Sequence, residues 1–244
     1  MLTADEILEK INRYIDSLQY NREPKGLYEP VKYVLSMGGK RIRPSLMLMA
    51  YNMYKDDPES ILSSACAIET YHNYTLLHDD LMDNADMRRG KQTVHVKWND
   101  NTAILSGDSM LVLAYRHFLD CRHDNLKQVL DLFTETALEI GEGQQYDMDF
   151  ETRTDVTEDE YIEMIRLKTS VLLACSLKIG AILAGAPSSA NRWGLLSSCK
   201  TIILTFTATL LCSERPSEAT FFATKRHICS STLSTVLMLP CAPN

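Results

Sequence analysis

The sequence predicts an all-α protein, a large helical bundle built as a single domain. The 244 residues are 45% apolar and 23% charged, a composition that supports a sizeable core and argues against intrinsic disorder. Only ten Gly and eight Pro interrupt the chain. Apolar residues recur at helical spacing up to residue 186, without the alternation that half-buried strands need.

Helix boundaries follow from the N-terminal residues onward. Thr3 and Glu6 have the spacing of a capping box, which predicts a first helix with an apolar face made of Ile7, Leu8, Ile11, Tyr14, Ile15 and Leu18. A second, short helix is expected over 27–36 and ends at two glycines. Pro44 is expected to be the first residue of a helix over 44–54, because proline is favoured at that position.

The remaining elements are read in the same way. Residues 84 to about 91 are polar and contain Gly90, which predicts a loop. The stop signal G-A-P at 185–187 ends the last helix. Apolar periodicity predicts helices over about 59–83, 101–120, 124–150 and 157–185.

Charge and cysteine content exclude some classes of protein. The net charge of −7 makes a broad nucleic-acid-binding surface unexpected, because such surfaces need clustered Lys and Arg. The seven Cys form no C-x-x-C pair, so neither a disulfide framework nor a zinc site is expected. The first 20 residues lack an uninterrupted apolar segment, so no signal peptide is expected, and a cytoplasmic protein is predicted.

An acidic cluster ends the predicted helix 59–83. The segment 78–83 reads H-D-D-L-M-D, and Asp79 and Asp83 are one helical turn apart on the same face. Three neighbouring carboxylates repel one another and contribute nothing to packing, but hard oxygen ligands suit Mg²⁺ with waters and substrate phosphates. The alternative is a solvated helix end that is acidic by chance.

Basic residues flank this cluster in the sequence. R-R-G follows at 88–90, and G-G-K-R-I-R-P occupies 38–44 at the start of a predicted helix. Helix N-termini favour anions, and the planar guanidinium of Arg matches phosphate oxygens. Together the two sets predict binding of two diphosphates, one through metal and one through Arg and Lys alone. Taken singly, these side chains could equally be solvated charges.

Two further motifs lie downstream on predicted helices. G-Q-Q-Y-D occupies 143–147, and a Lys-Thr pair, Lys168 and Thr169, lies within an apolar helix. A lysine at such a position is costly unless its charge is paired. The alternative is that Lys168 extends its stem to the surface.

These motifs together resemble the trans-isoprenyl diphosphate synthase (polyprenyl synthetase) family. Its pattern is G-G-K-R-x-R-P, H-x-x-x-x-x-H-D-D-x-x-D, R-R-G, G-Q-x-x-D and K-T, and the sequence matches each part in order over residues 1 to about 187. The resemblance implies an isoprenoid-synthase helical bundle around a central cavity. It also implies head-to-tail condensation of an allylic diphosphate with isopentenyl diphosphate, Mg²⁺ as cofactor, and a homodimer without stable membrane insertion.

The resemblance also implies a role for each matching residue. Lys40, Arg43, His72 and Arg89 would bind isopentenyl diphosphate, and Arg88 the allylic diphosphate. Asp79 and Asp83 would ligate Mg²⁺, supported by Asp80, and Gln144, Lys168 and Thr169 would lie along the allylic substrate. His78 and Asp147 also belong to the motifs. Product length in the family depends on bulk upstream of the acidic motif. Here Tyr74 and Thr75 stand five and four residues before Asp79, which predicts a fifteen- or twenty-carbon product.

The last 57 residues depart from the family. Five basic and two acidic residues follow Ala190, against 20 basic and 30 acidic before it, and no Asp follows Asp159. The family's second Asp-rich motif is therefore missing. We expect a truncated family domain over 1–187 and an atypical tail over 188–244, read out of frame or from an altered gene end. The alternative to an active enzyme is an impaired relative that binds diphosphates or pairs with a full-length synthase.

Overall fold

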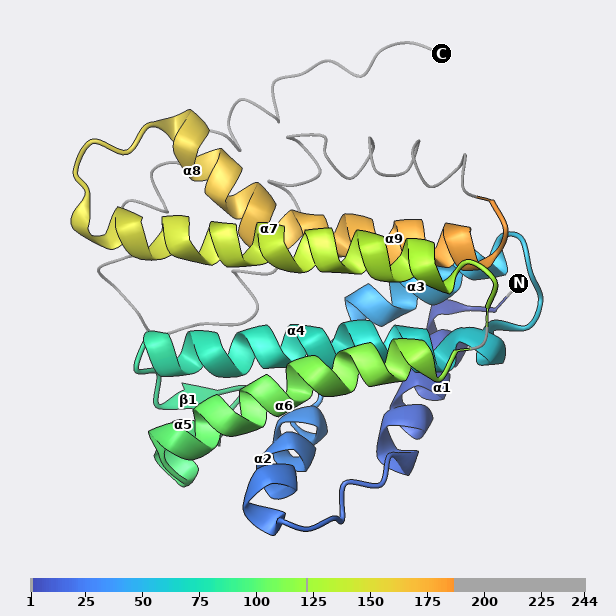
Figure 1. The fold of residues 1–244 in the computed structure, drawn as a ribbon, viewed down its shortest axis with the longest axis horizontal. Coiled ribbons are helices and arrows are strands. Elements are labelled where there is room, and N and C mark those ends of the chain that lie inside the picture. Colours follow the sequence, from blue (N-terminus) through green and yellow to red (C-terminus); the bar gives the residue numbers. More distant parts are fainter. Residues whose placement is uncertain (1, 122, 187–244) are drawn as a thin grey trace. The chain divides into compact units, whose positions relative to one another are not determined.

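The computed structural model describes residues 2–121 and 123–186, which form two compact parts: residues 2–135 with 172–186, and residues 136–171. The described residues are mainly helical, which confirms the all-α prediction (Figure 1). None of the described helices is long and apolar enough to cross a membrane. The predicted tail, 188–244, lies outside the described residues.

The first part begins with three helices whose ends are set by local chemistry. They are α1 (Ala4–Ser17), α2 (Lys25–Ser36) and α3 (Ile42–Asn52). Thr3 and Glu6 form the predicted capping box at the start of α1. The chain turns at Gly38 and Gly39, both with positive φ, so the predicted break after α2 is confirmed. The prediction that α3 begins at Pro44 was wrong by two residues, and the proline is tolerated because N–H groups in a first helical turn lack helical partners.

Helix α4 (Leu62–Met82) follows the short 3₁₀ helix η1 (Pro58–Ile61) and forms the centre of the first part. It is packed by α6 (Asp100–Leu119) and also contacts α1, α2 and α3. Small buried residues along α4, such as Ala65 and Ala67, allow this close approach. The site at its C-terminal end is therefore carried by a helix that is held on several sides.

The predicted loop after α4 contains a small two-stranded hairpin, where the sequence predicted no strand. Its strands are β1 (Met87–Arg88) and β2 (Lys91–Gln92), and α5 (Val94–Lys97) follows. Arg89 and Gly90 form the turn, both with positive φ. Four paired residues are too few to produce visible alternation in the sequence. The hairpin matters because it carries both arginines of the R-R-G motif.

Aromatic rings fill the core between α4, α6 and the first half of α7 (Leu126–Thr152). Phe133 contacts Tyr71, Tyr115 and Phe118 at centroid distances of 5.0, 5.1 and 4.8 Å. Pairs of this kind stabilise a fold by about 0.5–1.5 kcal/mol beyond their buried area. Helix α9 (Val171–Leu183) closes this part, and its Gly180 lies against the backbone of Met47 in α3, where a Cβ would clash.

The second part consists of the C-terminal half of α7, helix α8 (Glu158–Ile165) and the π-helical turn η2 (Arg166–Ser170). Thr157 and Glu160 cap α8 with a second capping box. Met164 and Ile165 are buried and packed by Phe150 and Tyr161. The single helix predicted over 157–185 was wrong at 166–170, because a π-turn changes hydrogen bonding without changing the apolar pattern.

Candidate active site

The acidic cluster occupies the last turn of α4. Asp83 is the C-cap residue, and its N–H donates to the carbonyl oxygen of Asp79 at 2.9 Å, so the two residues are on consecutive turns of one face. The side chain of Asp79 is 13% exposed and Asp83 is exposed. Asp80 is buried and accepts a hydrogen bond from Arg88 Nε at 2.6 Å. The cluster therefore divides into Asp80, which is hydrogen-bonded to Arg88, and the two less buried carboxylates of Asp79 and Asp83.

This division fits Mg²⁺ bound by few protein ligands. The described residues contain no group of three His, Cys, Asp or Glu side chains placed to hold a metal ion by themselves. Mg²⁺ is usually bound by one or two carboxylates, with waters and substrate phosphates completing its coordination. Asp79 and Asp83 are a donor set of that kind, and Asp80 orients Arg88 beside them. Arg88 Nη2 also lies 3.7 Å from Asp79 Oδ2.

The other hairpin arginine reaches the glycine loop before α3. Arg89 Nη1 donates to the carbonyl oxygen of Gly38, and a Cβ on Gly39 would lie 2.9 Å from the guanidinium carbon. Gly39 is thus required both for its φ of 134° and for the space that Arg89 occupies. The G-G and R-R-G motifs, about 50 residues apart in sequence, form one local structure.

His72 lies among the basic side chains and accepts a hydrogen bond from them. Arg43 Nη1 donates to His72 Nε2 at 3.0 Å. Burial, and then the charges of Arg43, Arg89, Arg88 and Arg41, hold the pKa of His72 well below its ordinary value. The ring is therefore neutral near pH 7 and can accept this hydrogen bond. One electropositive region thus contains four of the predicted residues, Arg43, His72, Arg88 and Arg89. Lys40 is exposed and lies in the glycine loop before α3.

Arg41 and Glu69 form a buried ion pair that the sequence analysis missed. Arg41 Nη1 lies 2.6 Å from Glu69 Oε1, and both side chains are 3% exposed. The available signal was Glu69 itself, a single charge in the apolar run A-C-A-I of α4. Its partner could not be inferred, because the two residues are 28 positions apart and one of them belongs to a motif already given a different role.

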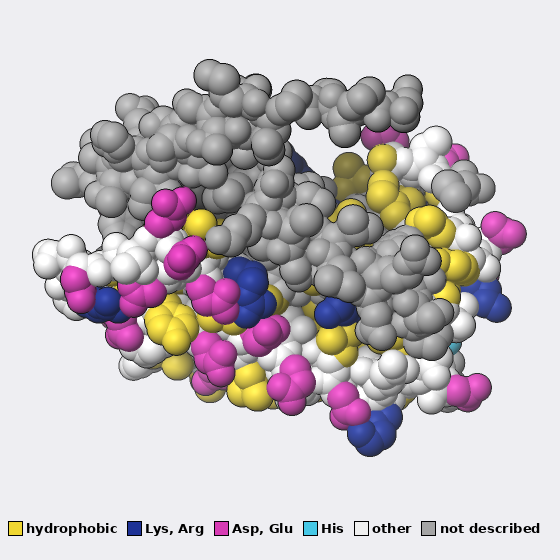
Figure 2. All heavy atoms as spheres, turned by 90° about the horizontal axis from the view of Figure 1, so that it is seen from above, with side chains coloured by type: hydrophobic (Ala, Val, Ile, Leu, Met, Phe, Trp, Pro, Cys, Tyr) yellow, Lys and Arg dark blue, Asp and Glu magenta, His cyan; other side chains and the backbone are white. Residues whose placement is uncertain are grey.

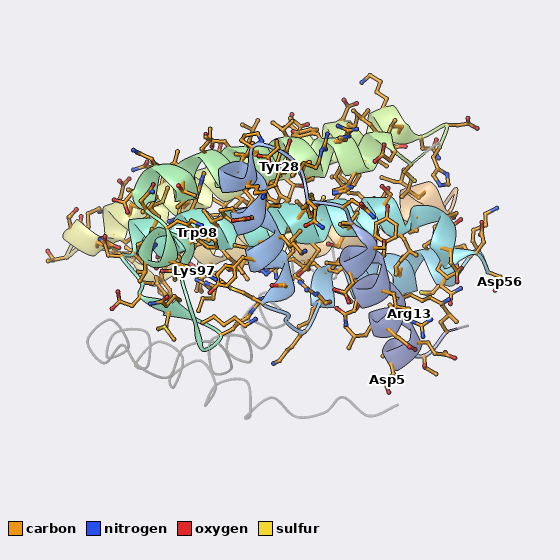
Figure 3. The ribbon with its side chains drawn as sticks, turned by 90° about the horizontal axis from the view of Figure 1, so that it is seen from below. Asp5, Arg13, Tyr28, Asp56, Lys97 and Trp98 are labelled. Atoms are coloured by element: carbon orange, nitrogen blue, oxygen red, sulfur yellow. The ribbon has the colours of Figure 1, made fainter. Side chains whose placement is uncertain are left out.

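An aromatic cluster holds the far side of the hairpin to α2. Tyr33 of α2 donates its hydroxyl proton to the carbonyl oxygen of Gln92 at 2.8 Å. Lys97 Nζ lies 3.7 Å from the centre of the Tyr33 ring, and Trp98 contacts that ring edge-on at 5.2 Å. Lys97 and Trp98 lie side by side in Figure 3. The two hairpin arginines are thus carried by a fixed element.

The second part places Lys168 beside Asp147. Lys168 Nζ lies 2.6 Å from Asp147 Oδ2, and the two side chains are 26% and 16% exposed. Gly143 brings α7 against the π-turn, because a Cβ there would collide with the backbone of Leu167 and Lys168. Gln144 and Thr169, neighbours of these residues in sequence, are half-buried. The costly lysine is therefore paired, and G-Q-x-x-D and K-T form one unit.

Tyr74, Thr75 and His78 lie on α4 before the acidic cluster. The half-buried Tyr74 ring lies 5.4 Å from Tyr71 and 4.8 Å from His78, and burial raises the pKa of its hydroxyl. Thr75 Oγ1 donates to the carbonyl oxygen of His72 within the helix. His78 packs on α6, where its imidazole occupies the space that a Cβ on Gly107 would need.

The chain is similar to known isoprenyl diphosphate synthases. The chain is 42% identical over 191 residues to a geranylgeranyl diphosphate synthase of Methanosarcina mazei, covering 76% of this chain and 59% of that protein. It is 43% identical over 208 residues to a short chain isoprenyl diphosphate synthase of Methanocaldococcus jannaschii, covering 84% and 62%. A crystal structure of a geranylgeranyl pyrophosphate synthase matches with a TM-score of 0.77 at 48% identity, covering 81% of this chain and 61% of that one.

The chain thus spans about three fifths of the length of these two curated relatives. The polyprenyl synthetase family model matches residues 24–203, a stretch that includes every motif described above. The chain belongs to the polyprenyl synthetase family.

Proposed function

We propose that the chain is a Mg²⁺-dependent prenyltransferase that joins an allylic diphosphate to isopentenyl diphosphate head to tail. The observation that carries this proposal is the arrangement at the end of α4. Arg88 lies 3.7 Å from Asp79, and Asp83 follows one turn later on the same helix face. Arg43 contacts the neutral His72, and the charge of Arg89 acts on the same ring. Two adjoining charge environments of this kind are matched to two diphosphates, one bound with metal and one without. The names of the relatives support the same reaction class.

Each basic residue has a distinct task in this proposal. Lys40, Arg43 and Arg89 bind isopentenyl diphosphate, and His72 orients Arg43 by accepting its hydrogen bond. Arg88, held in place by Asp80, contacts the allylic diphosphate next to Asp79 and Asp83. Mg²⁺, when bound there, would neutralise charge on the departing diphosphate.

The second part supplies a further group of candidate residues. Asp147 pairs with Lys168, and we propose that Lys168 acts with Gln144 and Thr169 on the allylic substrate.

The reaction requires that the protein stabilise charge on the leaving group and exclude water from the cation. Proton transfer by the protein is less important. The allylic C–O bond breaks, pyrophosphate leaves with the electron pair, and an allylic cation remains. The double bond of isopentenyl diphosphate attacks this cation, and loss of one proton restores neutrality. Arg88 stabilises the leaving group electrostatically. The apolar and aromatic residues below Asp79 exclude water, which would otherwise quench the cation.

The direct test is product formation from labelled isopentenyl diphosphate. Purified chain, Mg²⁺ and geranyl or farnesyl diphosphate should give labelled prenyl diphosphate, and chelation of the metal should stop it. A folded chain that binds both diphosphates but forms no product would favour the second candidate, an impaired relative that binds diphosphates or pairs with a full-length synthase. That candidate is favoured by the absence of Asp after Asp159.

Tyr74 is proposed to limit the product to fifteen or twenty carbons, and Tyr74→Ala should lengthen it. Five residues of helix place Tyr74 about 7.5 Å below Asp79, along the path of a growing chain. Removing the ring exposes Tyr71 beneath it. Chromatography of the products measures the change, and Tyr74→Phe, which keeps the ring, should leave product length as it is. A folded Tyr74→Ala enzyme with unchanged products would exclude Tyr74 as the limiting residue.

A homodimer and a cytoplasmic location remain part of the proposal. Leu105, Val112 and Leu119 of α6 are 60%, 68% and 58% exposed, and their seven-residue spacing aligns them on one stripe. An exposed apolar stripe of this kind supports association with a second copy, and sedimentation of the purified chain measures it. No nucleic-acid partner is proposed, because acidic side chains lie among Lys and Arg on the described part of the face in Figure 2.

A further inference from the structure

The buried ion pair of Arg41 and Glu69 connects four helical segments around the basic region. Besides Glu69, the Arg41 guanidinium donates from Nη2 to the carbonyl oxygen of Leu35 at 2.7 Å and from Nε to Asn12 Oδ1 at 3.4 Å. These partners belong to α4, α2 and α1, while Arg41 is itself the N-cap residue of α3. One side chain therefore fixes the backbone of the loop from which Lys40 and Arg43 project.

The other end of the pair is equally constrained. Asn73 Nδ2 donates to Glu69 Oε1 at 3.0 Å and to the Glu69 carbonyl oxygen at 2.8 Å. Glu69 lies three residues before His72 on α4, so the two side chains are neighbours on the helix surface. The pair consequently links the loop that carries Arg43 to the turn of α4 that carries its partner His72. Both ends of the Arg43–His72 hydrogen bond are set by the same buried contact.

The backbone conformation of Arg41 depends on these contacts. Its φ of 47° is left-handed, a conformation that costs free energy for a residue with a Cβ and is retained where the surroundings enforce it. Gly38 and Gly39 precede it, and Arg89 occupies the space beside Gly39. The loop 38–41 is thus held through Arg41 and contacted by the side chain of Arg89, which also donates to the carbonyl oxygen of Gly38.

We propose that Arg41 and Glu69 are positioning residues, which act through Arg43 and His72 on the binding of isopentenyl diphosphate and touch no substrate themselves. The proposal rests on the proposed function. Binding of the allylic diphosphate does not depend on the Arg41–Glu69 pair, because Arg88 is held by Asp80 and Asp79 lies on the last turn of α4. Loss of the pair should therefore impair one substrate and spare the other.

The test variant is the double change Arg41→Gln with Glu69→Gln. Neutralising both partners avoids leaving one buried charge alone, so the variant has the best prospect of folding. Calorimetry should give an isopentenyl diphosphate Kd raised by about 10- to 100-fold, because misplacement of binding groups by about 1 Å has effects of that size. The Mg²⁺-dependent Kd for farnesyl diphosphate should change less than about threefold.

Two further variants distinguish positioning from general loosening. Phe118→Leu removes part of a fully buried ring on α6 and lowers the melting temperature without touching the pair, so its isopentenyl diphosphate Kd should equal that of the unmodified chain. Asn73→Ala keeps both charges and removes the hydrogen bond from Asn73 to Glu69. It should raise the Kd for isopentenyl diphosphate by a smaller factor than the double variant does. It provides the test should the double variant fail to fold.

The outcomes separate the two proposals. An unmodified chain that binds no isopentenyl diphosphate would overturn the proposed function and this inference with it. Binding by the unmodified chain, together with an unchanged Kd in a folded double variant, would overturn the positioning role alone. An unchanged Kd in Asn73→Ala would do the same if the double variant does not fold. Equal weakening of both substrates, or equal weakening in Phe118→Leu, would reduce the pair to a structural contact.

Discussion

Asp79→Ala and Asp83→Ala are each expected to abolish Mg²⁺-dependent binding of an allylic diphosphate. These two carboxylates are the less buried members of the acidic cluster, whereas Asp80 is buried against Arg88. Removal of either takes away half of the carboxylate donor set, and the water that would replace it carries no negative charge to hold Mg²⁺ beside a diphosphate. Calorimetry with farnesyl diphosphate, with and without Mg²⁺, measures the loss. Turnover of the full reaction should fall by about 10²–10³ or more.

The structure allows this result to be separated from misfolding. Arg88 keeps its 2.6 Å hydrogen bond to Asp80 in either variant, so the arginine stays in place. Asp56, an exposed carboxylate far from the hairpin in Figure 3, provides the matched control, and Asp56→Ala should bind as the unmodified chain does. Binding without metal through Arg88 should persist weakly in all variants. Undiminished Mg²⁺-dependent affinity in both Asp79→Ala and Asp83→Ala would contradict the metal assignment.

The fold was predictable where one local signal decides the outcome. The capping box of Thr3 and Glu6, and the glycine break at 38–39, act through neighbouring residues, and both predictions were confirmed. The hairpin at 87–92 was not predictable, because it depends on Tyr33 of α2 and on Arg89 reaching Gly38. The π-turn was missed for a related reason, since the apolar pattern does not record which carbonyl each N–H reaches.

The candidate site, too, was predictable only where a local signal was sufficient. Motif spacing was sufficient to propose Asp79, Arg88 and Lys168 as candidate site residues, because these residue types in this order are unusual in a helical protein. Spacing could not reveal that Lys168 of the π-turn is paired with Asp147 of α7. Nor could it reveal that Arg41, in the middle of the G-G-K-R-I-R-P motif, pairs with the buried Glu69. A motif identifies which residues matter, but their partners depend on contacts between distant segments.

Replacement of residues 188–244 by a segment that carries a second Asp-rich motif should raise turnover by about 10²–10³. A suitable donor is a family member whose sequence contains that motif and whose matched residues are about as similar to this chain as those of the Methanosarcina mazei geranylgeranyl diphosphate synthase, which are 42% identical. The reason is electrostatic. A departing pyrophosphate needs its charge neutralised from both sides, and the sequence supplies one D-D-x-x-D motif, with no Asp after Asp159.

The kinetic form of the gain distinguishes this explanation from a general improvement in folding. Lys40, Arg43, His72 and Arg89 all precede the replaced segment, so the affinity for isopentenyl diphosphate should be nearly the same in both chains. The gain should appear in kcat, because the second cluster would act on the leaving group in the transition state. Turnover per folded molecule, with folded concentration taken from circular dichroism, is the quantity to compare. Equal kcat values would mean that Asp79, Asp83 and Arg88 suffice for ionisation. The hypothesis that carboxylates are required on both sides of the pyrophosphate would then be wrong.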